Sequence, residues 1–430
     1  MTIYRATVLD TPVDPFAGGA LRADSDTALV VTDGVITARG SYQDVRATAP
    51  DDQVVELRDG VLLPGFVDTH VHYPQIRAIG GLGRPLLDWL EHSALPEEAR
   101  LRDADYAAQV ADEFVHGMTQ AGTTSALVFG SHFATAVDAL FRSAERSGMR
   151  MTSGLVVSDR LLREDLLTTP ERAYDESVAL AARWQDHERL RYAVTPRFSY
   201  SCSADLLEAC GAAYKDIDGA WCTSHVNENV TEVAEVARLF DGSSYVGTYQ
   251  DHGLLDARTI LAHNVHPTDA ELDVLAAGRA AVAHCPTSNA SLGSGMFPMA
   301  EHLQHGVRVA MGTDVGGGTG FSLFKEGLQA YFLQSLLGSR GVPLTPTHLL
   351  HLITAAGADA LGLRDHIGDL DVGKRFDAVF VAPEADSPLG VGIRHAQSAE
   401  DALAKIFAMG TPADITRVWI DGELVKHDIH

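Results

Sequence analysis

Cysteine is scarce in this 430-residue chain. The four cysteines, Cys202, Cys210, Cys222 and Cys285, form no C-x-x-C pair. So few cysteines in a long chain are typical of a reducing compartment. Their spacing gives no indication of a structural zinc site.

Positive charge and long apolar runs are also lacking. The chain has 33 Lys and Arg residues against 58 Asp and Glu residues, which gives a formal net charge of −25. Nucleic acid and anionic membrane surfaces would repel such a chain, so we expect neither as a partner. No run of 18 or more apolar residues occurs, and the N-terminal residues lack a secretory pattern. We therefore expect a cytoplasmic protein.

The sequence pattern changes twice along the chain, which predicts an α/β architecture. Residues 1–63 are rich in short β patterns separated by turns. From residue 64, strand and helix patterns alternate roughly eight times over about 300 residues, as a (β/α)₈ TIM-type barrel requires. We predict a barrel over residues 64–365 and a small β-sandwich domain built from both chain termini, residues 1–63 and 366–430. A doubly wound sheet would give a similar alternation, so the count alone leaves that alternative open.

The C-terminal part is predicted in more detail. Pro346–Leu361 has the pattern of one amphipathic helix, and Pro383–Ser398 has that of a loop. Ala378–Val381 and Arg417–Ile420 have strand patterns. We expect these strands to pair with those of the N-terminal segment.

The clearest chemical signal lies in Leu62–Gln75, LLPGFVDTHVHYPQ, where an apolar run ends in His70 and His72. Residues two apart in a strand point to the same face, so both imidazoles can reach one ion. Two histidines this close often only fill a loop or the edge of a core. The pair therefore needs support from the rest of the chain.

Other candidate ligands also stand at the ends of predicted strands. His225 ends WCTSH, His263 ends TILAH, His284 ends AVAH, and Asp314 ends VAMGTD. Barrel enzymes build their sites at the C-terminal ends of their strands, because those ends converge on one face. Nitrogen and carboxylate ligands there suit zinc or iron(II) with an open position for water. Each histidine alone fits a core or loop position, but their common placement favours a metal site.

Two carboxylates near these strand ends are candidate proton carriers. Glu228 lies three residues after His225, and Asp314 opens the glycine-rich stretch Asp314–Gly320. Glu228 is close enough to reach whatever the metal binds, although a helix N-terminus would also favour a carboxylate there. The glycine-rich stretch lacks the G-x-x-x-x-G-K-[ST] pattern, so it indicates close backbone approach to the site rather than a phosphate loop.

The PGFVDTHVH element, a single histidine on each of two later strands, the terminal-strand aspartate and G-x-L-x-x-G-K at Gly368–Lys374 together resemble the amidohydrolase superfamily. Within it, several longer stretches resemble the guanine deaminase family. These are HYPQ (His72–Gln75), LLDWL (Leu86–Leu90), TPRF (Thr195–Phe198), SHVNEN (Ser224–Asn229), AHCPTSNASLGSG (Ala283–Gly295) and GTDVGGGTGFS (Gly312–Ser322). The resemblance covers nearly all of the chain.

This resemblance implies a zinc-dependent aminohydrolase that converts guanine into xanthine and ammonia with a zinc-activated water. It implies one zinc ion per subunit, with the ligands His70, His72, His225, His263 and Asp314. Glu228 would contact the substrate and carry protons to a ring nitrogen and to the leaving amine. Asp314 would take the first proton from the water, and His263 would help to orient it.

The resemblance also implies a small-molecule purine pocket. Gln75 and Arg197 would hydrogen-bond the purine oxygen and ring edge, and Trp89 and Phe198 would line the pocket. Without the motif, a surface ion pair would be the plainer role for Arg197, and core packing for the two aromatic residues. An exposed apolar helix at Phe324–Leu337 would suit the interface of a homodimer.

Two departures from the superfamily pattern leave the substrate open. Phe376 stands where a small residue is usual, and Asn264 and Pro267 alter the loop after His263. We expect local repacking or an altered rim near His263. An aminotriazine, a pterin or 8-oxoguanine is therefore an alternative substrate.

Other classes fit the sequence less well. No lysine lies between Met1 and Ala213, which disfavours a two-metal hydrolase of cyclic amides with a bridging lysine. The absence of C-x-x-C excludes the nucleobase deaminases with a P-C-x-x-C zinc signature. A non-catalytic binding protein of this superfamily would be expected to have a broken ligand set, whereas all five positions and Glu228 are intact.

Overall fold

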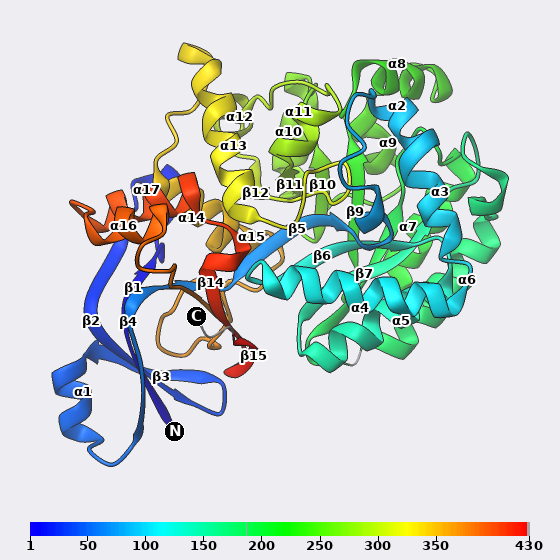
Figure 1. The fold of residues 1–430 in the computed structure, drawn as a ribbon. Coiled ribbons are helices and arrows are strands. Elements are labelled where there is room, and N and C mark those ends of the chain that lie inside the picture. Colours follow the sequence, from blue (N-terminus) through cyan, green and yellow to red (C-terminus); the bar gives the residue numbers. More distant parts are fainter. Residues whose placement is uncertain (186, 428–430) are drawn as a thin grey trace.

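A parallel eight-stranded sheet forms the larger part of the molecule (Figure 1). The computed structural model describes residues 1–185 and 187–427. The strands follow one another in chain order around the sheet: β5 (Phe66–His72), β6 (Thr123–Ser131), β7 (Arg150–Val157), β8 (Leu190–Pro196), β9 (Trp221–Val226), β10 (Thr259–His263), β11 (Ala281–His284) and β12 (Arg308–Met311). Helices follow the strands and cover the outside of this sheet. The expected (β/α)₈ barrel is confirmed.

Hydrogen bonds between β5 and the segment after β12 close the barrel. Asp314 N–H donates to the His70 carbonyl at 2.8 Å, and His72 N–H donates to the Val315 carbonyl at 2.8 Å. The buried Asp68 carboxylate accepts hydrogen bonds from the Thr313 hydroxyl and backbone N–H at 2.5 and 3.1 Å. These bonds bring the His-x-His element and Asp314 to the same place on the barrel.

Amphipathic helices pack their apolar faces against the strands. In α4 (Ala104–Gln120), Asp103 caps the N-terminus by accepting from two backbone N–H groups, and Val110, Phe114 and Met118 are buried. The other helices that follow the barrel strands are α5 (Ala134–Ser147), α6 (Pro170–Trp184), α7 (Ala204–Asp216), α8 (Val230–Leu239), α9 (Tyr245–Asp251), α10 (Asp269–Gly278), α11 (Pro286–Ser291), α12 (Met299–Gln304), α13 (Leu323–Leu336), α14 (Pro346–Ile353) and α15 (Ala355–Ala360).

A second sheet combines strands from both ends of the chain. Its order is β15-β14-β13-β4-β1-β2-β3, so β13 and β4 pair across the two ends. The strands are β1 (Thr2–Asp10), β2 (Arg22–Thr32), β3 (Val35–Ser41), β4 (Gln53–Pro64), β13 (Ala378–Val381), β14 (Ile415–Ile420) and β15 (Glu423–His427). The expected β unit from both termini is confirmed, and its seven strands form one continuous hydrogen-bonded sheet.

Phe376 belongs to the core of this second sheet. Its ring stacks on Tyr4 at a centroid distance of 4.4 Å and lies 5.5 Å from Trp419. All three side chains are buried. The expectation that Phe376 alters the rim near His263 is therefore wrong, because the large side chain fills an apolar space between strands.

Two details of the C-terminal part differ from the sequence prediction. The single helix expected at Pro346–Leu361 is divided into α14 and α15 at Thr354, whose hydroxyl donates to the Leu350 carbonyl at 2.5 Å. The predicted loop Pro383–Ser398 contains α16 (Pro388–Arg394), which begins after a Ser387 N-cap. A further helix, α17 (Ala399–Met409), follows it and packs on α13.

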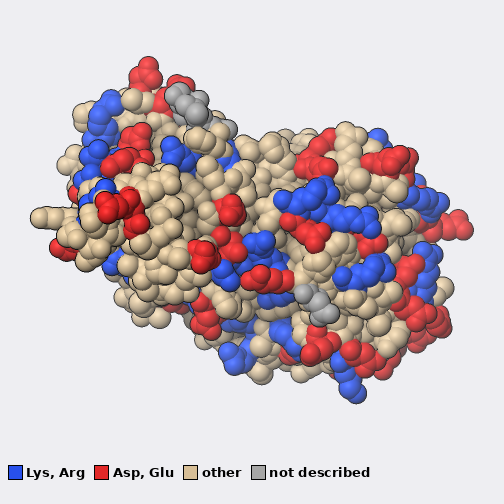
Figure 2. All heavy atoms as spheres, turned by 90° about the horizontal axis from the view of Figure 1, so that it is seen from below, with Lys and Arg blue, Asp and Glu red and all other residues tan. Residues whose placement is uncertain are grey.

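The surface carries charges of both signs. Figure 2 shows Lys and Arg interspersed with Asp and Glu on the face seen from below. Among the described residues, no helix combines the length and the apolar character that crossing a membrane requires.

Candidate metal centre and active site

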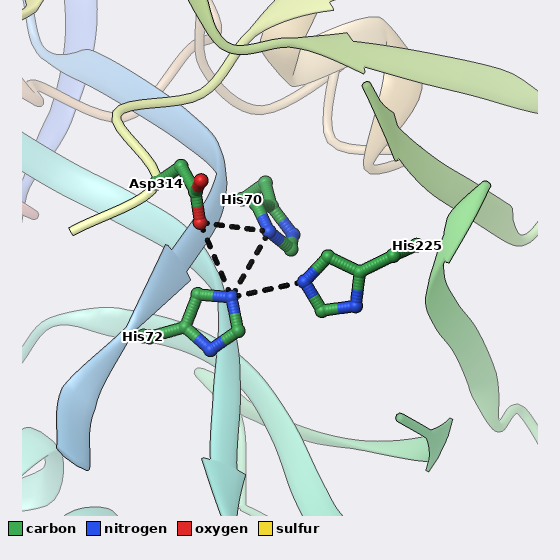
Figure 3. A group of neighbouring side chains, drawn as sticks. All are labelled: His70, His72, His225 and Asp314. Atoms are coloured by element: carbon green, nitrogen blue, oxygen red, sulfur yellow. Dashed lines mark hydrogen bonds and ion pairs between the residues drawn. The ribbon is translucent and has the colours of Figure 1, made fainter. Parts of the chain in front are cut away.

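Four predicted ligands converge at the C-terminal ends of the barrel strands (Figure 3). The Nε2 atom of His72 lies 3.2 Å from His70 Nε2, 3.1 Å from His225 Nε2 and 3.2 Å from Asp314 Oδ1. One donor atom from each of the four side chains lies within 4.8 Å of all the others. Three imidazoles and one carboxylate form a donor set that suits zinc or iron(II).

The surroundings keep the three imidazoles in the form that binds a metal. Burial lowers the pKa of His72 to about 4 and also lowers those of His70 and His225. A neutral imidazole has one nitrogen lone pair free for a metal. For His225 this nitrogen is Nε2, because Nδ1 lies 2.6 Å from the Arg197 carbonyl and donates to it.

Asp314 supplies the negative charge of this group. Burial alone would raise its pKa, but contacts with His70 and His72 outweigh burial and hold the pKa well below its usual range. Both histidine contacts fall on Oδ1, at 3.2 Å. The other oxygen, Oδ2, lies 3.8 Å from His263 Nε2.

His263 stands beside the four-donor group and is not a member of it. Its Nε2 lies 3.6 Å from Glu228 Oε2. Its Nδ1 lies 2.9 Å from the side-chain oxygen of Asn289 and donates to it, which fixes the ring. We did not predict Asn289 as a site residue, although it lies within the AHCPTSNASLGSG stretch.

Glu228 is buried and faces the same space as the metal group. It follows β9 through a turn at Asn227, whose φ is 48°. Ser294 donates a hydrogen bond to its Oε1 at 3.3 Å. Burial and the nearby charge of Asp314 raise the pKa of Glu228 well above its usual value, which favours the protonated carboxyl.

A narrow pocket connects the metal group with the predicted substrate residues. Gln75, Trp89, Arg197, Phe198 and Glu228 all line it, as do His72, His225, His263 and Asp314. Leu86, Leu90 and Leu292 complete the wall and had not been predicted.

Arg197 is buried in an ion pair with Glu98 of α3 (Leu95–Arg100). Its Nη1 donates to both Glu98 oxygens, at 2.9 and 2.7 Å. A surface ion pair, the plainer role considered for Arg197, is therefore wrong. No local pattern distinguishes Glu98, because α3 carries two adjacent carboxylates, Glu97 and Glu98, and only the fold turns Glu98 inward.

The glycine-rich stretch after β12 passes close to the site. A Cβ atom on Gly316 would lie 2.4 Å from the Gln75 carbonyl oxygen, and one on Gly317 would lie 3.0 Å from Asp314 Oδ2. The expected close backbone approach is confirmed. The loop after His263 also contributes to local packing, since Asn264 contacts His302 at 2.8 Å and accepts from Asn227 at 3.0 Å.

His284, the remaining strand-end histidine, lies apart from the metal group. Its ring stacks on Phe297 at a centroid distance of 4.3 Å, and burial lowers its pKa to about 3. It is a neutral core residue in this environment.

The chain as a whole is similar to proteins of one known family. Residues 61–425 match the family model described as "Amidohydrolase family". The chain is 56% identical to a probable guanine deaminase of Deinococcus radiodurans, over 99% of this chain and 98% of that protein.

Solved structures of similar proteins share the fold over nearly the whole chain. The guanine deaminase of Escherichia coli superposes with a TM-score of 0.95 at 34% identity, covering 99% of this chain and 100% of that one. A guanine deaminase of C. acetobutylicum with bound guanine gives a TM-score of 0.91 at 25% identity, covering 98% and 99%. An adenosine deaminase of Xanthomonas campestris with bound zinc gives 0.84 at 25% identity, covering 99% and 93%.

Proposed function

We propose, from the premise that the chain belongs to the amidohydrolase family, that it hydrolyses guanine to xanthine and ammonia. One observation carries this proposal. A metal-binding donor group, the buried carboxyl of Glu228 and the buried N–H donors of Gln75 and Arg197 all line a single pocket. The names of the similar proteins support guanine as the substrate.

We propose zinc as the metal, with one ion per subunit held by His70, His72, His225 and Asp314. The bound zinc of the similar adenosine deaminase supports this choice. Zinc in such a site lowers the pKa of a coordinated water toward 7 and so supplies a nucleophile at neutral pH. His263, which we had predicted as a fifth ligand, is better placed to orient the water, because its Nε2 faces both Glu228 and Asp314.

The chain's own residues divide the proton transfers between them. The Nε2 atoms of His70 and His72 lie 3.2 Å from Asp314 Oδ1, whereas Oδ2 lies 3.8 Å from His263 Nε2 and would accept the first proton of the water. Glu228 would donate its proton to a ring nitrogen next to carbon 2. It would then take the second proton of the water from the oxygen now bonded to carbon 2 and pass it to the amine that leaves as ammonia, and the proton held by Asp314 would return to Glu228. Oxygen bonded to carbon 2 replaces the amino group, which gives xanthine.

The pocket walls hold the ring in place for this reaction. Trp89 and Phe198 offer apolar surface, while Arg197 and Gln75 donate to the ring oxygen and edge. Aminotriazines, pterins and 8-oxoguanine are disfavoured as the main substrate by the similarity to guanine deaminases. The intact donor group disfavours a non-catalytic role.

Ammonia release from a panel of heterocycles tests the proposed function. We expect zinc-loaded protein to release ammonia rapidly from guanine, and slowly or not at all from 8-oxoguanine, a pterin and an aminotriazine. The zinc content of the same sample is measured by atomic absorption. Release from another ring alone would contradict the substrate, and no release from any ring by zinc-replete protein would contradict the activity.

We also propose that the protein is a homodimer that buries the exposed end of α13. This helix extends beyond the barrel in Figure 1 and exposes Tyr331, Phe332 and Leu336, the last of which is 73% accessible. Sedimentation should give twice the mass of one chain, and Leu336→Asp should give a monomer, because a charge would be buried in the interface. Val372→Asp, at an exposed residue outside α13, should remain dimeric. A monomeric wild-type protein at micromolar concentration would contradict the proposal.

A further inference from the structure

We propose that Glu98 is a positioning residue that sets which kind of ring edge the pocket accepts. It makes two neighbouring side chains present only hydrogen-bond donors to the substrate. The pocket would then select a ring with an acceptor, such as a carbonyl oxygen, at the edge that faces Gln75 and Arg197. This inference rests on the proposed function, because it concerns the orientation of the same substrate.

Glu98 lies behind the pocket and contacts side chains from three separate segments of the chain. It is 2% exposed. It accepts from Gln75 Nε2 at 2.7 Å and from Arg197 Nη1 at 2.9 and 2.7 Å, and His132 Nε2 lies 3.3 Å from its Oε2. Burial alone would raise the pKa of Glu98, but Arg197, His132 and Gln75 outweigh burial and hold the pKa below its usual range. Glu98 is therefore a carboxylate, which can only accept hydrogen bonds.

These contacts fix the orientation of the Gln75 amide. Its Nε2 donates to Glu98 at 2.7 Å, and its Oε1 accepts from the Gly316 backbone N–H at 3.2 Å. A flipped amide would place its oxygen against a carboxylate and its nitrogen against an N–H group, so both bonds would be lost. The remaining N–H of Gln75 has no partner among residues 1–185 and 187–427, and Gln75 lines the cavity. Gln75 therefore presents a donor to a ligand.

The same carboxylate holds the guanidinium of Arg197. Both oxygens of Glu98 accept hydrogen bonds from one nitrogen of Arg197, Nη1. The other two nitrogens, Nε and Nη2, have no hydrogen-bond partner in the described part of the chain. Arg197 lines the cavity and has no acceptor atom of its own. Both side chains that face this edge of the ligand are thus donors.

A donor-only edge discriminates between rings that differ in one exocyclic group. The 6-oxo group of guanine accepts a hydrogen bond, whereas a 6-amino group is a donor and would leave buried N–H groups facing N–H groups. A site built to hydrogen-bond one group rejects a ligand that lacks it by factors that reach about 10⁴ to 10⁵. Hypoxanthine and adenine carry these two groups on the same ring, differ otherwise in the proton on the adjacent N1, and both lack the 2-amino group, so they report on this edge.

Two substitutions at Glu98 test the proposal, with Glu97→Gln as the matched control. Glu97 lies next to Glu98 in α3, but it faces away from the pocket and pairs with Arg100 and Tyr106. Glu98→Gln keeps the size of the side chain and introduces a donor, so the Gln75 amide can turn its oxygen to the ligand. Glu98→Asp keeps an acceptor-only group with a shorter reach.

Competitive inhibition of guanine deamination by hypoxanthine and by adenine is the measurement, on zinc-loaded proteins. We expect the wild-type protein and Glu97→Gln to prefer hypoxanthine by on the order of 100-fold or more. Glu98→Gln should lower this ratio at least about tenfold and raise the KM for guanine more than it lowers kcat. Glu98→Asp should keep the ratio within about threefold of wild type even though both ligands bind more weakly.

The outcomes separate this inference from the proposed function. An unchanged inhibitor ratio in Glu98→Gln, in a protein that deaminates guanine, would overturn the role of Glu98 and leave the function intact. If Glu98→Gln does not fold, Glu98→Asp provides the test: loss of the preference for hypoxanthine over adenine in that variant would also overturn the role of Glu98. A wild-type protein that releases no ammonia from guanine would instead contradict the proposed function, and isothermal calorimetry with the two purines would then measure the ratio.

Discussion

Glu228→Gln is expected to retain zinc and to lose turnover by about 10³-fold or more, within the range that general acid–base catalysis contributes. Burial and the charge of Asp314 raise the pKa of this carboxyl, which favours the protonated form that can donate. A glutamine amide fills the same space and can still accept from Ser294, but it cannot pass a proton to the ring or to the leaving amine. Steady-state ammonia release and zinc content measured on the same sample check this result.

The matched control for this variant lies on the following helix. Glu235 of α8 is partly exposed and pairs with Arg238 at the surface, so Glu235→Gln should keep wild-type turnover. Near-wild-type turnover in Glu228→Gln would mean that another group carries the proton. Loss of zinc from Glu228→Gln would mean that the carboxyl supports the metal group instead.

His72→Ala is expected to release the metal and to abolish measurable deamination. His72 Nε2 lies within 3.2 Å of donor atoms from the three other members of the group. The substitution therefore removes the ligand atom that lies next to all the others. Changes in residues that only support metal ligands typically cost 10- to 100-fold in metal affinity, so the loss of a ligand should cost more than about 100-fold. Equilibrium dialysis against a competing chelator measures the affinity.

The exposed His92 provides the control for removal of an imidazole. Its Nδ1 lies 2.9 Å from the Asp88 carbonyl oxygen, outside the donor group, and His92→Ala should bind zinc and turn over like the wild type. Chelator treatment of the wild-type protein should reproduce the loss seen in His72→Ala, and added zinc should restore activity to the treated wild type only. Full zinc occupancy in His72→Ala would contradict the proposed ligand set.

Several features of the site followed from local rules. The two-residue period of a strand places His70 and His72 on one face, and their Nε2 atoms lie 3.2 Å apart. Parallel strands end on one face of a barrel, which brings His225 and Asp314 to the same point from distant parts of the sequence. Here the strand patterns predicted both the fold class and the region of the site.

Other features were outside the reach of local patterns. His284 ends a strand as His225 does, but its ring turns into the core against Phe297. The predicted loop Pro383–Ser398 contains a helix that begins at Pro388. Its start is marked in the sequence only by Ser387 as the N-cap and the proline that follows. The strand-rich pattern of the termini likewise did not specify that all seven strands join in one sheet.

The sequence by itself predicted the strand–helix alternation that a barrel requires, the donor residues at the strand ends and the presence of a nearby carboxyl, because these depend on residue type and on chain order. Only the tertiary structure decided which donors meet and how their partners orient them. Glu98 lies 23 residues from Gln75 and 99 from Arg197, and Asn289 lies 26 residues from His263. Such pairings depend on how the barrel closes and which helix face turns inward, and no periodicity in the chain encodes them. The physical reason is that a buried polar group needs a hydrogen-bond partner, and that partner is whichever group the fold brings next to it, however distant it is in the sequence.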